Sequence, residues 1–327
     1  MKALVIGGGS IGKRHTLNIL NEFKNANVLL ITKHSSREDK LFYDKRVSVK
    51  ESFDNKEFFD LVYIASPASM HEENLNSINI NCRNILIEKP LYNGFEKENF
   101  FVKKNNWEKI FIGYVLRVDP IIFKTKEIIN SGQLGDLYHG RVWAGQYLPE
   151  WRPTTDYRKT VSAQKKLGGG PLHELSHEID YVTYLLGQLP KSVFCNLEKF
   201  TDLEIDTEDY CSLKLKFKKS QINLELDFIA SPSKLGFCFY FKNGTIEGNF
   251  VSRELIVTCQ NIIQNIDVKI ESFNSLYIKQ LHTLNSKLDP NKLQTIEPAS
   301  LNDASQTMNI IKAAIESDKL LKWTKVL

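Results

Sequence analysis

Near the start of the chain, a short apolar run leads directly into a cluster of glycines. The run from Ala3 to Ile6 is typical of a strand that is buried on both faces of a sheet. Gly7, Gly9 and Gly12 follow with the spacing GxGxxG, and apolar residues at helical spacing come next. A strand, a glycine turn and a helix in this order are the fingerprint of a dinucleotide-binding fold, in which the N-terminus of the helix binds the pyrophosphate. We therefore expect cofactor contacts from the turn as a whole: Gly7, Gly9, Ser10, Ile11 and Gly12.

The end of the second predicted strand indicates which nicotinamide dinucleotide binds. An acidic residue at this place usually binds the ribose 2′-hydroxyl of NAD. The segment after Val28–Ile31 instead carries Lys33, Ser35 and Arg37, with no carboxylate before Glu38. Basic and hydroxyl side chains suit the additional 2′-phosphate of NADP. The sequence favours NADP, and NAD is the alternative.

Three further apolar runs alternate with other segments up to residue 118, and each ends in polar or turn-forming residues. The runs are Leu61–Ala65, before Ser66-Pro67; Ile85–Ile87, before Glu88-Lys89-Pro90; and Phe111–Gly113, four residues before Arg117. The alternation predicts a doubly wound parallel sheet over residues 1–118. Because ligands bind at the carboxyl ends of such strands, we expect cofactor contacts from Ser66, Pro67, His71, Glu88 and Lys89. An exposed position on a helix is the alternative for His71.

After residue 118 the pattern changes to short segments in which apolar and polar residues alternate. In Tyr210–Phe217, for example, Leu213 and Leu215 alternate with lysines, as in a strand with one buried and one solvated face. The predicted fold class is therefore α/β: an N-terminal Rossmann-type sheet, then a second α+β domain over 119–327 with a large, mostly antiparallel open sheet. Helices are expected over Pro120–Asn130, Asn274–Leu284 and Ala304–Leu321, the last packing back towards the N-terminal domain.

Three glycines, Gly168 to Gly170, and Pro171 introduce a predicted helix that is loaded with ionisable residues. His173, Glu174 and His177 are three or four residues apart and would share one face of a continuous helix. Two histidines and a carboxylate on one face indicate a site rather than a solvated surface.

The same residues match HExxH, the zinc-protease helix in which two histidines bind the metal. No third ligand is identified, although Glu198, Glu204 and Glu208 are candidates. A dinucleotide fingerprint has no role in a zinc protease, so we expect no metal site, and the metalloprotease remains an unfavoured alternative.

A long segment between Gly145 and Lys166 is punctuated by prolines and rich in aromatic and basic residues. Long ordered loops in compact domains are usually functional, and arginines bind carboxylates or phosphates. We expect substrate contacts here from Tyr147, Trp151, Arg152, Tyr157 and Arg158. A packing arm at a subunit interface is the equal alternative. The basic residues of this segment favour an anionic sugar, such as a nucleotide-activated sugar or a sialic-acid-like nonulosonate, and an unphosphorylated cyclitol is the alternative.

Composition excludes several classes of protein. The chain has 327 residues, a formal net charge of +4 and no basic cluster of the kind that binds nucleic acid. Its five cysteines are dispersed without metal-binding spacing, as in a reducing compartment. No stretch approaches 18 apolar residues, so we expect no membrane association and a cytoplasmic location.

The order of four motifs resembles the Gfo/Idh/MocA oxidoreductase family over nearly the whole chain. The motifs are GxGxxG, Glu88-Lys89-Pro90, Gly113-xxx-Arg117 and Gly168-Gly-Gly…His177-xx-Asp180. The loop after Gly145, together with Glu174–Tyr181, is similar to a branch associated with surface-polysaccharide sugars. The resemblance implies a Rossmann domain, a C-terminal sheet that packs into homodimers or homotetramers, and hydride transfer between NAD(P) and a carbinol of a sugar.

The family's lysine maps onto Lys89 and its histidine onto His177. Oxidation of a carbinol requires removal of the hydroxyl proton, and His177 is the first candidate because imidazole titrates near neutral pH. Lys89 would stabilise the charge on the same oxygen. The family usually has Asp four residues before the histidine, where this chain has His173, so either Glu174 orients His177 or His173 contacts substrate.

Arg117 either positions substrate or cofactor, or forms an ion pair between domains. Two other readings of the whole chain remain open. One is a binding-only sensor without turnover, and the other is a family member that uses bound NAD for lyase or epimerase chemistry.

Overall fold

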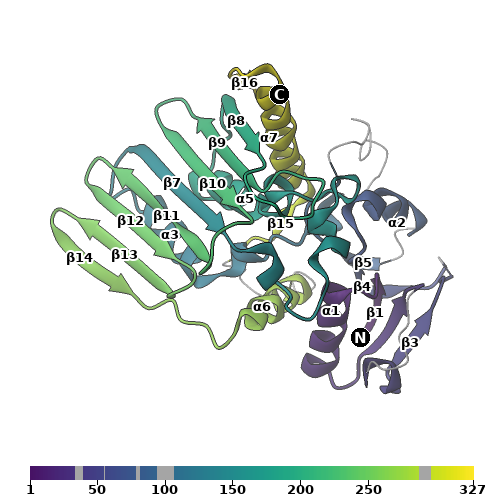
Figure 1. Cartoon of the computed structure of the whole chain (residues 1–327). Helices are drawn as coiled ribbons and strands as arrows, with labels where there is room; N and C mark the ends of the chain where they lie inside the picture. Colours follow the sequence, from purple (N-terminus) through teal and green to yellow (C-terminus); the bar gives the residue numbers. More distant parts are fainter. Residues whose placement is uncertain (34–39, 55, 79–81, 94–106, 287–295) are drawn as a thin grey trace. The chain divides into compact units, whose positions relative to one another are not determined.

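The computed structural model describes residues 1–33, 40–54, 56–78, 82–93, 107–286 and 296–327. These residues form two compact units, and each unit contains two separate stretches of chain (Figure 1). The first unit comprises Met1–Val115 and Ser272–Ala304, and the second comprises Leu116–Glu271 and Ser305–Leu327.

The first unit contains a seven-stranded sheet in the order β15-β6-β5-β4-β1-β2-β3. Six strands are parallel, and β15 lies antiparallel to β6 at one edge. The strands are β1 (Lys2–Ile6), β2 (Asn27–Ile31), β3 (Val47–Lys50), β4 (Phe59–Ile64), β5 (Cys82–Ile87), β6 (Ile110–Ile112) and β15 (Ala299–Ser300). The predicted parallel sheet is confirmed. Its order reverses between β1 and β4, which is where ligands bind in such sheets.

The helices of the first unit are α1 (Ser10–Glu22), α2 (His71–Ser77), α6 (Phe273–Ser286) and the beginning of α7 (Leu301–Leu320), with short 3-10 turns at Lys40–Tyr43, Ala68–Met70 and Trp107–Lys109. Although α6 comes from near the end of the chain, its Leu281 and Leu284 belong to the same core cluster as Val5 and Ile19. The Asn84 amide also donates to the carbonyl of Leu284 at 2.8 Å. The segment 272–304 is therefore part of the packed core of the first unit.

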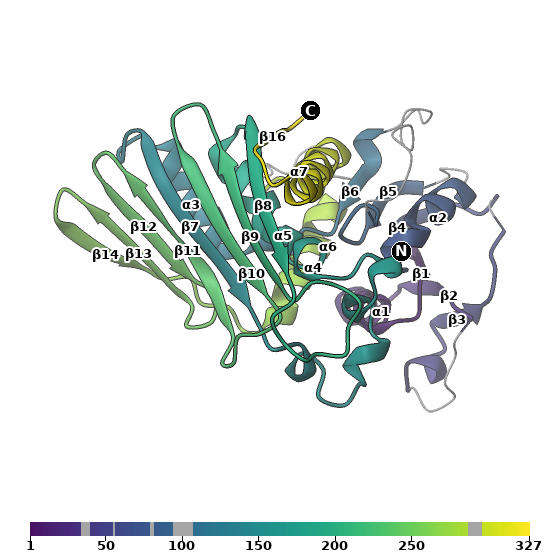
Figure 2. The same ribbon diagram turned by 45° about the horizontal axis from the view of Figure 1, so that its top comes forward.

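The second unit contains a nine-stranded sheet in the order β14-β13-β12-β11-β7-β10-β9-β8-β16 (Figure 2). Only β7 and β10 pair in parallel, and the other pairs are antiparallel, as predicted. The strands are β7 (Leu137–Gly145), β8 (Ser192–Glu198), β9 (Tyr210–Lys216), β10 (Gln221–Asp227), β11 (Lys234–Phe241), β12 (Gly244–Asn249), β13 (Glu254–Cys259), β14 (Ile262–Ile266) and β16 (Thr324–Lys325).

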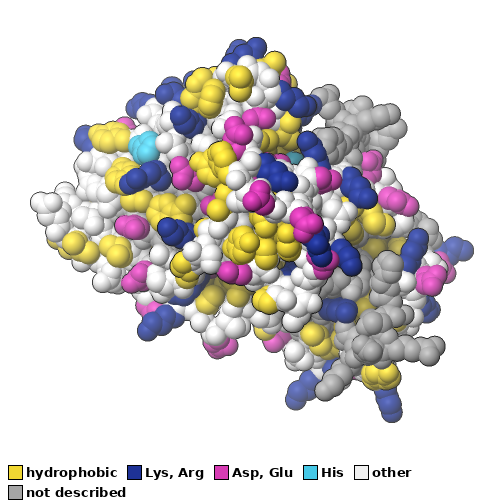
Figure 3. All heavy atoms as spheres, viewed as in Figure 1, with side chains coloured by type: hydrophobic (Ala, Val, Ile, Leu, Met, Phe, Trp, Pro, Cys, Tyr) yellow, Lys and Arg dark blue, Asp and Glu magenta, His cyan; other side chains and the backbone are white. Residues whose placement is uncertain are grey.

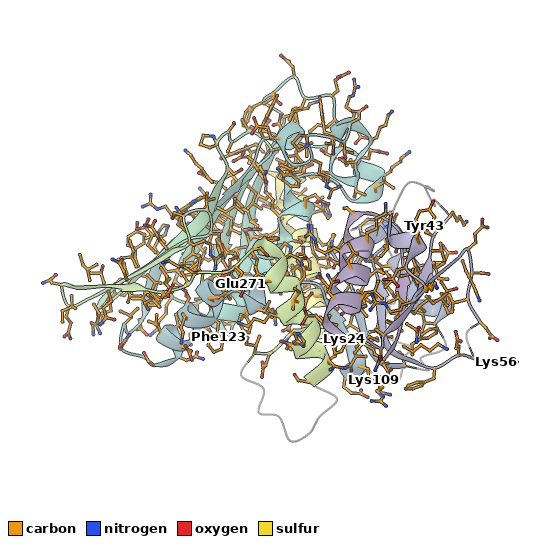
Figure 4. The ribbon with its side chains drawn as sticks, turned by 90° about the horizontal axis from the view of Figure 1, so that it is seen from below. Lys24, Tyr43, Lys56, Lys109, Phe123 and Glu271 are labelled. Atoms are coloured by element: carbon orange, nitrogen blue, oxygen red, sulfur yellow. The ribbon has the colours of Figure 1, made fainter. Side chains whose placement is uncertain are left out.

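One face of this sheet is covered by helices. On β9, Cys211, Leu213 and Leu215 are fully buried on that face, while Lys214 and Lys216 are exposed on the other. The covering helices are α3 (Pro120–Asn130), α4 (Pro171–Glu174), α5 (Ser176–Leu186) and most of α7, and a 3-10 turn, η4 (Val115–Val118), precedes α3. Tyr181 of α5, for example, lies 5.9 Å from the ring of Phe237 on β11. Figure 4 labels Phe123, which lies on α3.

Within the residues that the structure describes, no helix combines the length and apolar character needed to cross a membrane.

A buried charge fixes the beginning of α3. The Asp119 side chain is inaccessible to solvent, accepts a hydrogen bond from the Ile121 N–H at 2.8 Å and caps the helix. The Arg253 guanidinium donates to both of its oxygens at 2.8 and 2.9 Å. Asp119→Ala leaves this arginine without its carboxylate and the helix without its cap. We expect the free energy of unfolding, measured by urea titration, to fall by about 3–5 kcal/mol.

The control for this variant is Asp136→Ala. Asp136 pairs with Lys219 at 3.6 Å, but both side chains are largely exposed, so the expected loss is no more than about 0.5 kcal/mol. Equal losses in the two variants would show that the buried pair does not stabilise the fold.

Candidate active site

The glycine turn of the first unit leaves space for a ligand at the N-terminus of α1. Gly7 has a φ of +114°, and a Cβ on Gly12 would lie 1.9 Å from the Gly7 carbonyl oxygen, so backbone segments meet here. Gly9 caps α1 without a side-chain hydrogen bond, and a Cβ on it would meet no atom within 4 Å. The first N–H groups of a helix have no acceptor within the helix. An open approach to such donors fits the pyrophosphate of a dinucleotide.

The residues that would select NADP are only partly described. Lys33 is exposed just after β2. Ser35 and Arg37 lie outside the described residues, so their contact with a 2′-phosphate stays a prediction.

His71 connects two turns at the carboxyl ends of the parallel strands. It is inaccessible to solvent; its Nε2 lies 2.9 Å from the Ser66 carbonyl oxygen and its Nδ1 lies 3.1 Å from that of Leu91. Burial lowers the pKa of His71, although these two carbonyl groups and the Glu88 charge oppose the shift. The alternative of an exposed helix position is therefore wrong. His71 links the Ser66-Pro67 turn after β4 to the chain that follows Pro90, and its cofactor contact stays a prediction.

The Glu88-Lys89-Pro90 motif follows β5 and lies at the same carboxyl ends of the parallel strands. Lys89 is partly buried. Glu88 is buried, and its carboxylate lies 2.7 Å from the Nε2 of His15 on α1. Burial, and secondarily the charge of Glu88, raises the pKa of Tyr63 on β4. The Glu88 carboxylate thus lies close to the backbone of the predicted catalytic lysine.

Sequence reasoning did not identify His15. The available signal was its spacing, because His15 shares the buried face of α1 with Gly12, Thr16 and Ile19.

In the second unit, the predicted continuous helix is wrong. The backbone leaves the helical conformation at Leu175 (φ −97°, ψ 29°), which separates α4 from α5. The Leu175 N–H donates to the Pro171 carbonyl and completes the single turn of α4. The Glu178 N–H then donates to the Leu175 carbonyl and forms the first turn of α5. His173 and Glu174 therefore lie on a different helix from His177. HExxH requires all three residues on one continuous helix, which this segment does not form.

The ionisable residues of this segment also differ in their exposure to solvent. His173 is 7% exposed, whereas Glu174 and His177 are partly accessible. Over the described ranges, no three His, Cys, Asp or Glu side chains lie together in a group that could hold a metal ion.

Glu208, one of the candidate zinc ligands, packs against the glycine turn before α4. Gly170 has a φ of +93°, and a Cβ on it would lie 2.3 Å from Oε1 of Glu208. Burial raises the pKa of Glu208, opposed by hydrogen bonds that include the backbone N–H of Leu172. The carboxylate thus lies at the beginning of α4, where glycine leaves room for it.

Arg117 forms a buried ion pair with Asp180 inside the second unit. Its Nε and Nη2 donate to the two carboxylate oxygens at 2.9 and 2.7 Å, and the side chains are 4% and 2% exposed. The guanidinium also lies 4.6 Å from the ring centre of Tyr184. The pair fastens η4 to α5, the helix that carries His177. A contact of Arg117 with substrate or cofactor stays a prediction.

The aromatic and basic loop after β7 is folded into four 3-10 turns, at Leu148–Glu150, Tyr157–Lys159, Val161–Ala163 and Lys165–Leu167. Tyr147, Trp151 and Tyr157 pack against a core cluster that includes Phe228. The Arg158 guanidinium donates to Asp156 at 2.8 Å and to Glu204 at 3.0 Å. Arg152 is exposed. The aromatic rings thus contribute to packing within this unit, and the predicted substrate contacts remain untested.

The predicted catalytic residues come from both units. Lys89 belongs to the first unit, and Glu174 and His177 belong to the second. Their convergence on one substrate atom stays a prediction.

Two family models match the chain. The model described as "Oxidoreductase family, NAD-binding Rossmann fold" matches residues 1–100, and the "GFO/IDH/MocA C-terminal domain" matches residues 122–247. The first match covers the glycine turn and Glu88-Lys89-Pro90, and the second covers α4 and α5.

Among curated relatives, the chain is 25% identical over 218 residues to a scyllo-inositol 2-dehydrogenase (NADP(+)) of Bacillus subtilis, covering 65% of this chain and 58% of that protein. It is 24% identical over 141 residues to a 2,7-anhydro-N-acetylneuraminate hydratase of Mediterraneibacter gnavus, covering 42% of this chain and 36% of that protein. The chain thus matches about half of the length of such relatives, or less.

Among solved structures, a levoglucosan dehydrogenase in complex with NADH is 19% identical and superposes with a TM-score of 0.82 over 100% of this chain and 99% of that chain. At this identity the likeness shows a shared fold.

The open space at Gly9 generates a direct test. Its backbone is ordinary (φ −71°) and a Cβ would contact nothing, so Gly9→Ala should leave the melting temperature of the unliganded protein unchanged. The added methyl group would occupy the approach of the pyrophosphate to the backbone. We expect the Kd for NADH or NADPH, measured by fluorescence titration, to rise by about tenfold or more. Unchanged affinity would place the dinucleotide elsewhere.

Proposed function

The chain belongs to the Gfo/Idh/MocA oxidoreductase family, and from this we propose that it is an NAD(P)-dependent enzyme that transfers a hydride between the nicotinamide and a carbinol or ketone of a sugar or polyol. The observation that carries the proposal is the open N-terminus of α1 at Gly9, with Lys89 at the end of β5 in the same parallel sheet. Strand ends next to the reversal of strand order are where such sheets bind ligands.

In the proposed mechanism, the bound cofactor would accept the hydride in oxidation and supply it in reduction, and the residues of the chain transfer the proton. His177 removes the hydroxyl proton of the substrate in oxidation and returns a proton in reduction. The Lys89 ammonium hydrogen-bonds to the same oxygen and stabilises its developing negative charge. Glu174 orients His177 or binds a neighbouring hydroxyl, and Arg117 acts through Asp180 by fixing the helix that carries His177.

The narrower substrate proposal is an anionic or nucleotide-activated sugar of surface-polysaccharide synthesis. Exposed basic side chains of the loop after β7 support it, namely Arg152, Lys165 and Lys166. Arg158 adds less, because it is already paired with two carboxylates. Neutral polyols remain the nearest rival substrates, since a relative is named as an inositol dehydrogenase.

For the cofactor we propose NADP, with NAD as the alternative. The exposed Lys33 after β2 supports NADP. Similar proteins agree with either cofactor, because one relative is named as NADP(+)-linked and a structural neighbour is described with NADH.

A second candidate function is chemistry without net oxidation, in which the bound dinucleotide is reduced and reoxidised within each turnover. The relative that is named as a 2,7-anhydro-N-acetylneuraminate hydratase favours this candidate. The discriminating measurement is absorbance at 340 nm during turnover of a sugar panel: a dehydrogenase accumulates reduced cofactor in proportion to product, and the second candidate does not.

We further propose that the uncovered face of the nine-stranded sheet joins copies of this chain into a homodimer or homotetramer. Figure 3 shows hydrophobic side chains among charged ones on this face. A hollow of about 850 Å³ there is lined by Trp143, Phe200, Tyr210 and Tyr240 among other residues. Phe200 is exposed and the other three are partly accessible, and aromatic clusters that reach the surface in this way mark interaction surfaces.

Trp143→Glu should place a buried charge in that interface and shift the protein towards monomer in sedimentation velocity. The matched control is Lys218→Glu, which also adds negative charge but lies in the exposed turn between β9 and β10. A wild type that is monomeric at micromolar concentration, or equal effects of both variants, would contradict an interface on this face.

The catalytic assignment has its own test. Lys89→Ala and His177→Ala should each lower kcat by about 100-fold or more, because each removes a group that acts on the reacting oxygen. His177→Ala should leave the Kd for the nucleotide unchanged, since His177 lies outside the dinucleotide-binding unit. Intact turnover in both variants would contradict the assignment, and nucleotide binding without any turnover by the wild type would indicate a sensor.

A further inference from the structure

A histidine that the proposed mechanism does not use is almost fully buried on the phosphate-binding helix. His15 of α1 is 2% exposed. Its ring lies 4.4 Å from that of Tyr63 on β4, tilted by 33°, and 5.7 Å from that of Tyr277 on α6, nearly edge-on. Two aromatic rings from different elements thus fix the imidazole plane between the sheet and α6.

The imidazole is aimed at the residue before Lys89. Nε2 of His15 lies 2.7 Å from Oε1 of Glu88, and the two side chains are 3% and 10% exposed. A carboxylate accepts hydrogen bonds, so the two atoms form one in the tautomer of His15 that carries its hydrogen on Nε2. Hydrogen bonds to charged acceptors are stronger than neutral ones, and a carboxylate buried to this extent requires such a donor.

Residues at the ends of three parallel strands, β4, β5 and β6, surround Glu88. The Glu88 N–H donates to the carbonyl of Ile64, the last residue of β4, at 2.9 Å. Its Oε2 lies 3.4 Å from the backbone nitrogen of Lys89. A Cβ at Gly113, just after β6, would lie 2.8 Å from Oε2, so glycine leaves the room that the carboxylate occupies. The backbone around Glu88 thus encloses one carboxylate oxygen, and the His15 side chain lies within hydrogen-bond distance of the other.

We propose that His15 is a positioning residue for Lys89: its hydrogen bond to Glu88 ties the helix that binds the pyrophosphate to the turn that presents the catalytic amine. The proposal rests on the proposed function, which places Lys89 at the reacting oxygen. His71 holds the other side of this turn through the Leu91 carbonyl. The helix and the turn therefore move as one, and the amine keeps its place relative to the cofactor.

The alternative is that His15 only fills space in the core. Two substitutions separate these possibilities. His15→Gln keeps an N–H donor near the position of Nε2, whereas His15→Leu has a similar volume and no donor. A third substitution, Glu88→Gln, changes the hydrogen-bond partner of His15: it removes the carboxylate but keeps the shape of the side chain.

We expect His15→Leu to lower kcat by about 100-fold, the cost of displacing a catalytic group by about 1 Å. KM and the Kd for the nucleotide should change by no more than about threefold, because the substrate and phosphate contacts remain. His15→Gln should restore kcat to within about threefold of the wild type. Glu88→Gln should lower kcat by less than His15→Leu, because its amide oxygen still accepts the hydrogen of Nε2, with a folded protein by circular dichroism.

Hydrogen–deuterium exchange of the unliganded protein gives a readout that needs no substrate. Peptides covering residues 84–93 should exchange faster in His15→Leu than in the wild type, and at the wild-type rate in His15→Gln. Peptides from the second unit should be unchanged in both variants.

Unchanged exchange and kcat in His15→Leu would overturn the proposal. So would an equal loss in His15→Gln, which would show that the packing of the ring matters rather than its hydrogen bond. If the wild type binds no nucleotide, the proposed function fails, while the exchange comparison still reports whether His15 holds the turn.

Discussion

The close approach of β1, α1 and β4 at the glycine turn is the constraint on which the site depends. Any side chain at Gly12 would overlap the Gly7 carbonyl, and any side chain at Gly7 would overlap the backbone of Ala65. The two glycines therefore let α1 begin directly at the end of β1, next to the point where strand order reverses. That placement opens the helix N-terminus to a dinucleotide and, one turn further on, brings His15 to Glu88. The proposed binding of the cofactor and the proposed positioning of Lys89 therefore depend on one local packing requirement.

Buried charges organise the second unit in a comparable way. Arg117 with Asp180, and Arg253 with Asp119, are pairs of full charges with little or no access to water. Removing one partner from such a pair is costly, because the other remains buried without compensation. The pair of Arg253 with Asp119 fixes the beginning of α3. The pair of Arg117 with Asp180 fixes α5, which carries His177. The proposed proton-transfer residue thus stands on a helix that is anchored by charge pairing as well as by the aromatic packing of Tyr181.

The sequence predicted the features that local patterns encode. GxGxxG located the turn and α1, and the alternation of Leu213 and Leu215 with lysines predicted a sheet with one buried face. It missed features that depend on distant contacts. β14 has four exposed residues out of five, so it shows no alternation to read. The break at Leu175 follows from backbone hydrogen bonds that HExxH-type spacing does not encode, and His15 acquires its role from Glu88, 73 residues away.

Titration of the purified protein with NADPH and NADH, followed by nucleotide fluorescence and with zinc content determined on the same sample, separates a dinucleotide-binding enzyme from a zinc protein. We expect saturable binding of a reduced dinucleotide at one site per chain, without stoichiometric zinc. Tighter binding of NADPH would agree with the role proposed for Lys33. Stoichiometric zinc with no nucleotide binding would contradict the account and return His173 and His177 to consideration as metal ligands.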